Sequence, residues 1–248
     1  LFVHEFTNHT DLDAGIATAR LLTGLGYRIH IAGNVASART YISKGFLRKA
    51  KKLITKDIQV LGPLVSDSCP LVGIEPSAIL GFRDEFPDLA GDRLRPEASR
   101  LAQNAFTLEE FIASEFKAGR IRRDMFTGEP AEVLVHVHCH GKAIATSAPV
   151  LAALGIPANY RVREIPSGCC GMAGAFGYEK EHYELSRKVG ELVLFPEVRS
   201  ASPATIICAP GTSCRHHIKD GTGRRAIHPA EVLFRAMRPG WQAVQKAD

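Results

Sequence analysis

Residues 167–174 read Ser-Gly-Cys-Cys-Gly-Met-Ala-Gly, and they place two adjacent cysteines, Cys169 and Cys170, between glycines. Neighbouring side chains point to opposite faces of a strand and diverge on a helix, so both thiols can reach one point only if the backbone turns sharply. Glycine permits such a turn because it adopts positive φ, and it leaves amide N–H groups free to donate to sulfur. This stretch therefore indicates either a thiolate–metal site or, as the alternative, a vicinal disulfide or two buried structural thiols.

The positions of the other cysteines favour the metal site. The chain has six cysteines, and five of them lie in its second half. Cys139 follows the alternating run 133–137, and Cys214 follows the apolar run 204–208, so single cysteines close two strand-like runs as the pair closes a third. The carboxyl ends of parallel strands line one edge of an open α/β sheet, where ligands bind. We therefore expect the thiols of Cys139, Cys169, Cys170 and Cys214 to meet at such an edge.

Composition is typical of a globular protein, with 248 residues, 45% hydrophobic and 23% charged. The net charge of +5 is spread along the chain, and without a basic stripe or known motif we expect no nucleic-acid partner. No apolar run approaches the ~18 residues of a membrane span, and no signal peptide is recognised. We therefore predict reduced thiols and a cytoplasmic protein, either free or peripheral at the inner membrane. The start at Leu1, inside an apolar run and without an initiator Met, favours a piece of a longer polypeptide.

Strand-like and helix-like runs alternate along the chain, which predicts an α/β fold with parallel sheets covered by helices. In the first half we expect strands at 1–6, 27–32 and 70–74, helices at 12–25 and 45–54, and mainly helix from 75 to 116. A polar stretch at 117–130 has the composition of a linker. In the second half we expect strands at 133–137, 159–165 and 204–207, with helices at 143–154 and 179–195.

The two halves can be superimposed in sequence, which indicates an internal duplication. Thirty positions separate Phe6 from Ala36 and also Cys139 from Cys169, while 41 separate Ser37 from Ala78 and 44 separate Cys170 from Cys214. In this register the first half carries Phe6, Ala36, Ser37 and Ala78 where the second carries its four cysteines. We therefore predict two pseudo-symmetric lobes, residues 1–124 without cluster cysteines and residues 125–248 with them.

Three segments resemble the cysteine-rich "CCG" domain, namely 138–143 with Cys139, 167–174 with the cysteine pair, and 211–216 with Cys214. This domain occurs in heterodisulfide reductase, in the iron–sulfur subunits of glycolate oxidase and anaerobic glycerol-3-phosphate dehydrogenase, and in lactate-utilisation proteins. The chain is most similar to the C-terminal region of FAD-linked oxidases of the D-lactate and D-2-hydroxyglutarate dehydrogenase type. The first half keeps only Gly73–Ser77 of the pattern, and the resemblance covers essentially the whole chain.

The resemblance implies an iron–sulfur cluster, expected as [4Fe–4S], held by Cys139, Cys169, Cys170 and Cys214. It implies an electron-transfer module of an FAD-linked 2-hydroxyacid dehydrogenase (D-lactate, glycolate or 2-hydroxyglutarate type) that passes electrons from flavin to a quinone or another acceptor. FAD-binding and ferredoxin-like domains would lie on a longer chain or on a partner subunit, and the isolated chain would lack dehydrogenase activity. Many relatives end with Cys-x-x-Cys, whereas five residues separate Cys208 from Cys214 here. Cys208 and His140 are the additional candidate ligands.

Four thiolates on a cluster leave net negative charge, which nearby basic groups would offset. The candidates are Lys142, Arg215, His138, His140, His216 and His217. A tetrahedral zinc site on the same cysteines, structural or hydrolytic, is the main alternative. Two others are an interaction scaffold with inert cysteines and a catalytic cluster of the heterodisulfide-reductase type. Cys69 is expected to be a buried structural thiol.

Overall fold

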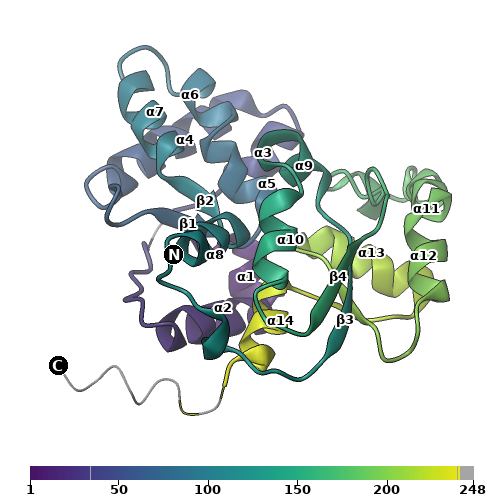
Figure 1. The fold of residues 1–248 in the computed structure, drawn as a ribbon. Helices are drawn as coiled ribbons and strands as arrows, with labels where there is room; N and C mark the ends of the chain where they lie inside the picture. Colours follow the sequence, from purple (N-terminus) through teal and green to yellow (C-terminus); the bar gives the residue numbers. More distant parts are fainter. Residues whose placement is uncertain (34, 239, 241–248) are drawn as a thin grey trace.

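A computed structural model describes residues 1–33, 35–238 and 240, and it has two parallel β-sheets covered by helices (Figure 1). The first sheet pairs β1 (Leu71–Gly73) with β2 (Ala105–Thr107). The second has the order β4-β3-β5-β6, with β3 at Ala131–Val135, β4 at Tyr160–Glu164, β5 at Ile206–Cys208 and β6 at Ala226–Ile227. The predicted α/β class with two mainly parallel sheets is confirmed.

The strand orders of the two sheets correspond. A parallel bridge joins Phe2 to Gly73, so the first half has the order Phe2–β1–β2. The second half has β3–β5–β6 in the same sequence of crossovers, with β4 added outside β3. Strand β1 is followed by a helix that begins at Pro76, and strand β5 is followed by a helix that begins at Thr212. This common order is the one that an internal duplication would leave.

Fourteen α-helices occur among the described residues. In the first half they are α1 (Glu5–His9), α2 (Leu12–Gly24), α3 (Arg39–Ser43), α4 (Leu47–Leu61), α5 (Pro76–Ile79), α6 (Glu85–Leu89), α7 (Arg95–Gln103) and α8 (Leu108–Lys117). In the second half they are α9 (Cys139–Ala145), α10 (Ala148–Leu154), α11 (Tyr183–Leu192), α12 (Leu194–Ser200), α13 (Thr212–Thr222) and α14 (Pro229–Ala236). None of these helices is long and apolar enough to cross a membrane.

The helices and sheets enclose three hydrophobic clusters, and the central one is shared by both halves. It takes side chains from α2 and α8 of the first half and from α10 and α14 of the second, together with Val72 of β1 and Val135 of β3. A second cluster lies on the other face of the first sheet, around α4 and α7. A third, which includes Leu134, lies on the other face of the second sheet under α12 and α13. Alternation along a strand sends successive side chains to opposite faces, which is why Leu134 and Val135 belong to different clusters.

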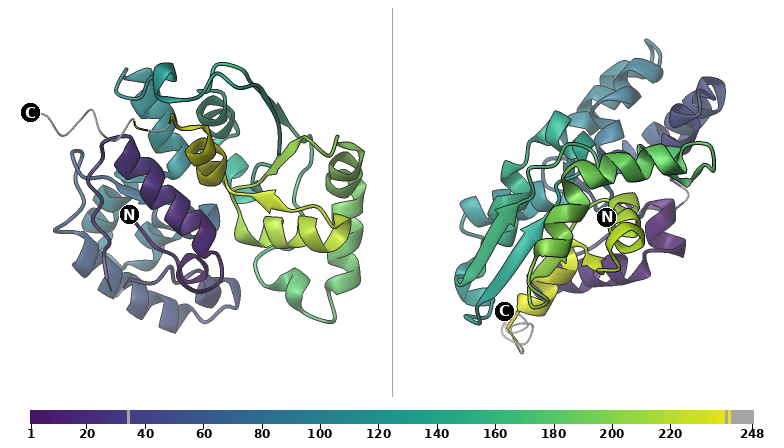
Figure 2. Two further views of the ribbon diagram at one scale, coloured as in Figure 1. Left: turned by 90° about the horizontal axis from the view of Figure 1, so that it is seen from below. Right: turned by 90° about the vertical axis from the view of Figure 1, so that its right-hand side faces the viewer.

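In the central cluster, helices of one half pack against helices of the other half. α8 packs against α10, and α14 packs against α2, so the last helix of each half contacts the second helix of the other. Figure 2 shows α14 lying beside α2. Both α8 and α14 begin with a capping box, formed by Thr107 with Glu110 and by His228 with Glu231. The division into residues 1–124 and 125–248 stays a prediction, but the two halves share one core.

Several expected strands and boundaries were wrong. The run 1–6 forms only the bridge at Phe2 before α1 begins at Glu5, and 27–32 forms no strand. The short strands β2 and β6 were not expected. The stretch 117–130 is no free linker, because Ile121, Met125 and Phe126 are buried in the central cluster.

Two long predicted helices are each broken into two. The segment 143–154 belongs to α9 and α10, which are separated where Thr146 takes φ +64°. The segment 179–195 is divided into α11 and α12 at Val193, with φ −145°. In the first half the basic helix α4 extends to Leu61, beyond the expected end at 54, because Ile58 and Leu61 bury their side chains.

Candidate metal centre

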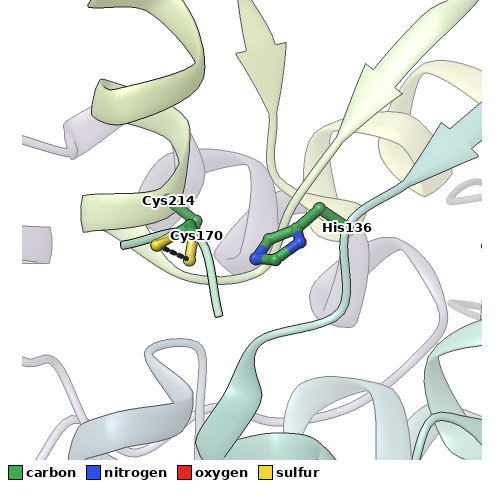
Figure 3. A group of neighbouring side chains, drawn as sticks. All are labelled: His136, Cys170 and Cys214. Atoms are coloured by element: carbon green, nitrogen blue, oxygen red, sulfur yellow. Dashed lines mark hydrogen bonds between the residues drawn. The ribbon is translucent and has the colours of Figure 1, made fainter. Parts of the chain in front are cut away.

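Four cysteines gather at the carboxyl edge of the second sheet. Cys139 begins α9 just after β3, Cys169 and Cys170 lie in the loop after β4, and Cys214 lies in the first turn of α13 after β5. The sulfurs of Cys170 and Cys214 are hydrogen-bonded at 3.3 Å (Figure 3). Both are buried, whereas Cys139 and Cys169 are partly exposed. The edge thus carries an inner pair and an outer pair of thiols.

The cysteine pair is turned by Gly171. This glycine has φ +109°, and its N–H donates to the Sγ of Cys169 at 3.3 Å. A Cβ at this position would lie 2.3 Å from the backbone oxygen of Ser186 in α11. Glycine is therefore required both by the backbone angle and by the close approach of the helix.

The four thiols share protons, because neighbouring thiolates repel one another. Hydrogen bonds with Cys139 and Cys170 lower the pKa of Cys169, and the same contact raises the pKa of Cys139. The hydrogen bond with Cys170 lowers the pKa of Cys214, while the hydrogen bonds with Cys169 and Cys214 raise the pKa of Cys170. In each hydrogen-bonded pair one thiol thus loses its proton more readily than the other, and a metal would take the place of the shared protons.

His136 completes this group, although the sequence analysis did not select it. A ring nitrogen of His136 and the sulfurs of Cys170 and Cys214 all lie within 4.8 Å of one another. The residue directly follows β3 and is 0% exposed. The only sequence signal was a histidine three positions before Cys139, in a run with two further histidines. The sheet register, which puts the ends of β3 and β5 side by side, is what brings His136 to Cys214.

The outer thiols face a cleft of about 340 Å³ between the two halves. Cys139, Cys169 and Cys170 line one wall, with His138, His140, Ala173 and Tyr178. The first half supplies the opposite wall with His4, Phe6, Arg39, Thr40, Ser43, Glu75 and Ser77. Phe6, the sequence counterpart of Cys139, therefore lies across the cleft from the thiols.

The expected basic groups divide into those near the thiols and those engaged elsewhere. Lys142 donates to the carbonyl oxygen of Ser167 at 2.7 Å and so fixes the loop that leads to the cysteine pair. His217 hydrogen-bonds to the carbonyl oxygen of Cys170 at 2.9 Å, and His216 bonds instead to the Tyr178 hydroxyl. His138 caps α9, where its ring accepts the N–H of His140. Burial lowers the pKa of His140, which lines the cleft beside Cys139.

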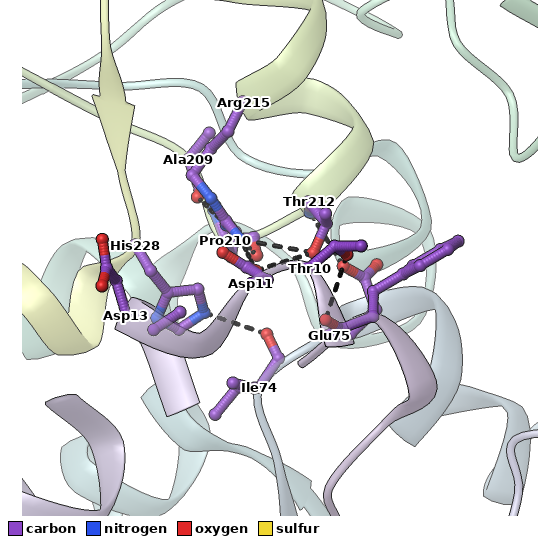
Figure 4. A network of polar contacts seen from close by, with 12 residues as sticks. Thr10, Asp11, Asp13, Ile74, Glu75, Ala209, Pro210, Thr212, Arg215 and His228 are labelled. Carbon is purple, nitrogen blue, oxygen red and sulfur yellow. Dashed lines mark hydrogen bonds and ion pairs between the residues drawn. The ribbon is translucent and has the colours of Figure 1, made fainter. Parts of the chain in front are cut away.

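Arg215 does not face the sulfurs but joins the two halves. Its guanidinium donates to the carbonyl oxygens of Ala209 and Pro210, each at 2.7 Å, and pairs with Asp11 (Figure 4). Asp11 also accepts the Thr212 hydroxyl at 2.9 Å, and buried Glu75 accepts the Thr212 N–H at 2.8 Å. The first half therefore holds the amino end of α13, in the same turn as Cys214.

Glu75 is kept ionised in this network. Burial alone would raise its pKa, but the nearby His138 and the N–H of Thr212 lower the pKa to about 2. A carboxylate at the start of α13 also interacts favourably with the helix dipole. This charge belongs to the half that contributes no cysteine to the site, and it supports the helix that bears Cys214.

The remaining cysteines lie apart from the group. Cys208 in β5 is 0% exposed and packs in the central cluster, whereas Cys170 and Cys214 pack in the cluster on the other face of the sheet. Strand alternation therefore directs Cys208 away from the sulfurs. Cys69 is exposed, in the turn before β1, so the expectation that it is buried was wrong.

The residues present fit a thiolate-bound metal centre. Four thiols at one sheet edge match the ligands of iron–sulfur clusters, and zinc also takes cysteine and histidine. The ring Nε2 of His136 is buried without a hydrogen-bond partner among the described residues, and such an atom is satisfied by a ligand. The site can thus hold a soft metal centre, with its outer side open to the cleft.

Comparison with known proteins gives three informative relatives. D-2-hydroxyglutarate dehydrogenase of Escherichia coli (strain K12) is 27% identical over 236 residues, 94% of this chain and 22% of that protein. The enzyme of the same name from Pantoea ananatis is 25% identical over 87% of this chain and 20% of its own length. One of the subunits of anaerobic glycerol-3-phosphate dehydrogenase from Escherichia coli (strain K12) is 22% identical over 94% of this chain and 57% of its own length.

The chain therefore spans about a fifth of the length of the D-2-hydroxyglutarate dehydrogenases that it matches. No family model matches the chain. The relatives are oxidoreductases of the two kinds that the cysteine segments indicated. The resemblance predicted from those segments is confirmed: over most of its length the chain is similar to a CCG-type region of FAD-linked oxidases and of anaerobic glycerol-3-phosphate dehydrogenase.

Proposed function

We propose that the chain is the iron–sulfur electron-transfer module of an FAD-linked 2-hydroxyacid dehydrogenase. The observation that carries this proposal is the convergence of Cys139, Cys169, Cys170 and Cys214 at one sheet edge, beside a cleft. These four cysteines would hold the centre, expected as [4Fe–4S]. Cys208 is left out of the proposed ligands because it faces the central core. The similarity to D-2-hydroxyglutarate dehydrogenases supports the proposal.

When bound, such a centre accepts and passes on single electrons. The chain's own groups hold the sulfurs and exclude water from the inner ones. The Gly171 N–H donates to Cys169, and hydrogen bonds to sulfur are among the factors that set the potential of such centres. Burial of Cys170 and Cys214 keeps water from one side, while Cys139 and Cys169 face the cleft. Transfer to and from the centre would therefore take place on the cleft side.

We propose that flavin-binding and ferredoxin-like domains act with this module, on a longer chain or on a partner subunit, and that a quinone or another carrier accepts the electrons. The organic step belongs to the flavin, so the chain alone would have no dehydrogenase activity. Thiolates at such a site require a reducing compartment, and we place the module in the cytoplasm.

A zinc centre is the second candidate, favoured by one observation. A nitrogen of His136 and the sulfurs of Cys170 and Cys214 lie within 4.8 Å, close enough together for a single ion. Metal analysis distinguishes the candidates. The chain purified anaerobically should contain iron and acid-labile sulfide and show broad visible absorption, whereas a zinc protein would be colourless and contain neither.

The test of function replaces the cysteine pair in the complete enzyme. In C169S/C170S, substrate should still reduce the flavin, because that step does not involve this module. Transfer to an artificial or quinone acceptor should fall at least about 100-fold, because the ligands of the carrier are gone. C69S, at an exposed thiol outside the site, is the matched control and should behave as wild type. Unchanged turnover to the acceptor in C169S/C170S would refute the electron-transfer role.

A further inference from the structure

The side chain of His136 has an unexplained feature. It is completely buried, and its Nε2 has no hydrogen-bond partner among the described residues. A buried polar atom without a partner is destabilising, so native proteins rarely keep one without a bound ion, a water or a ligand. The position of His136 indicates which kind of partner its Nε2 atom would take.

His136 points toward the inner thiols. Figure 3 shows its ring edge directed at the sulfurs of Cys170 and Cys214, and the three ligand atoms lie within 4.8 Å of one another. The three residues come from different segments, the end of β3, the loop after β4 and the start of α13. No solvent reaches this nitrogen, and the inner sulfurs are the metal-binding atoms nearest to it.

The other ring nitrogen is fixed as it is in metal-bound histidines. Nδ1 lies 2.8 Å from the Oγ of Ser167, the residue that opens the cysteine loop. The carbonyl oxygen of Ser167 accepts from Lys142, which holds the serine in place. A histidine ligand usually donates its second N–H to an oxygen, and this contact sets the tautomer and the ring orientation. In the tautomer that carries its hydrogen on Nδ1 and donates it to Ser167, the lone pair of Nε2 faces the thiols.

The other histidines near the site lack this combination. Both nitrogens of His217 are engaged, by the carbonyl oxygen of Cys170 and by the Ser186 hydroxyl. Nδ1 of His138 accepts a backbone N–H. His140 has an unpaired Nδ1 but is partly exposed in the cleft, and its Nε2 lies 3.8 Å from Asp84. His136 is therefore the histidine placed to bind a metal on the inner side.

We propose that His136 is a ligand of the metal centre through Nε2, in one of the four ligand positions otherwise taken by the cysteines, and that Ser167 holds its tautomer. This inference rests on the proposed function, since it requires a metal centre at the cysteines. A neutral imidazole adds no negative charge to the centre. Where histidine replaces cysteine on iron–sulfur centres the reduction potential rises. The inner histidine would thus make this centre easier to reduce than one with thiolates alone.

The test is a nitrogen signature in the full 248-residue chain, prepared anaerobically with iron and sulfide. Pulsed electron paramagnetic resonance on the paramagnetic state should detect strong nitrogen coupling that changes when histidine is labelled with ¹⁵N. The coupling should disappear in H136Q and H136C. H140Q removes the other candidate histidine ligand of the same run and should keep the coupling, which distinguishes the two histidines. In H136C the midpoint potential should fall below that of wild type.

The outcomes separate this inference from the proposed function. A centre that forms in wild type without histidine coupling, or a coupling that persists in H136Q, overturns the assignment of His136 alone. A chain that takes up no iron or sulfide overturns the proposed function and this inference with it. Circular dichroism of the metal-free variants checks folding, and if H136Q fails to fold, the isotope measurement on wild type with H140Q still decides.

Discussion

At the scale of single residues, Gly171 determines whether the cysteine pair can turn toward one point. Its φ of +109° is unfavourable for any residue with a side chain, and a Cβ would meet the Ser186 oxygen at 2.3 Å. Gly168, two positions before Cys170, has no atom within 4 Å of an added Cβ. A side chain is therefore excluded at position 171 and has room at position 168.

We predict that G171A loses most of its bound metal and about 2–3 kcal/mol of stability, because strain and the clash with α11 displace the thiols. At this chain length the loss corresponds to a Tm lower by about 5–10 °C. G168A is the control and should match wild type within about 0.5 kcal/mol. Iron and sulfide content and thermal unfolding measure both effects. Full metal content in G171A would contradict the role given to this turn.

The cysteine positions could be read from sequence, but His136 could not. Two adjacent cysteines between glycines form a local pattern, and a cysteine that follows a strand-like run can also be recognised from neighbouring residues in the sequence. His136 lies in an alternating run where a histidine has no distinguishing mark. Its importance comes from the pairing of β3 with β5, which no local pattern specifies. The prediction that Cys69 is buried was wrong for the same reason, since the exposure of a turn depends on which elements cover it.

At the scale of elements, the contact between α2 and α13 joins the halves next to the site. Asp11 precedes α2 and pairs with buried Arg215 of α13, while Asp13, two residues on, pairs with exposed Arg225. The side chains of the first pair are 16% and 7% exposed, and those of the second are 73% and 64% exposed. The two carboxylates thus form a natural matched pair for experiment.

We predict that D11A lowers the free energy of unfolding by about 2–4 kcal/mol, because it leaves the buried guanidinium of Arg215 without its counter-charge. D13A should change it by less than about 1 kcal/mol, because solvent screens an exposed pair. Urea unfolding of the metal-free chain measures both. Equal effects of the two substitutions would show that burial of the Asp11 pair does not stabilise the contact.

Element types were predictable where the hydrophobic period was clear, as for β3, β4 and α4. The strands β2 and β6, of three and two residues, are too short to show a period. The helix break at Thr146 has a sequence signal that was overlooked, because Pro149 lies in the first turn of α10 and opposes a helix that runs through it. The break at Val193 likewise lies three residues before Pro196. Residues 117–130 look like a linker by composition, and only the shared core explains why Met125 and Phe126 are buried.

At the scale of the whole molecule, the shared core encloses ionisable groups that make stability depend on pH. Glu109 of α8 is 1% exposed, and burial raises its pKa to about 7. His228, beside it at 3.8 Å, has its pKa lowered to about 3 by burial. Between pH 4.5 and 7 the folded chain keeps the Glu109 proton that the unfolded chain has lost. The contribution of Glu109 to stability therefore falls as pH rises through this range, and that of His228 rises between pH 3 and 6.5.

We predict that E109Q becomes more stable relative to wild type as pH increases from about 4.5 to 7.5, by up to about 3 kcal/mol. The amide keeps the size of the side chain and removes its titration, so the difference isolates Glu109 from His228. E129Q, at an exposed carboxylate, is the control and should show no such trend. Urea unfolding of the metal-free chain at several pH values measures the difference. A constant difference between E109Q and wild type across this range would refute the assignment.

Asp11 and Glu75 of the first half hold the amino end of α13, so the association of the two halves is coupled to metal binding in the second half. Cys214 lies on that helix, so a metal that orders the sulfurs also strengthens the hold of the first half on the second. By linkage, the factor by which bound metal would strengthen this hold is also the factor by which the hold would strengthen metal binding. A half that retains no sulfur ligand thus still determines how tightly the other half keeps its metal.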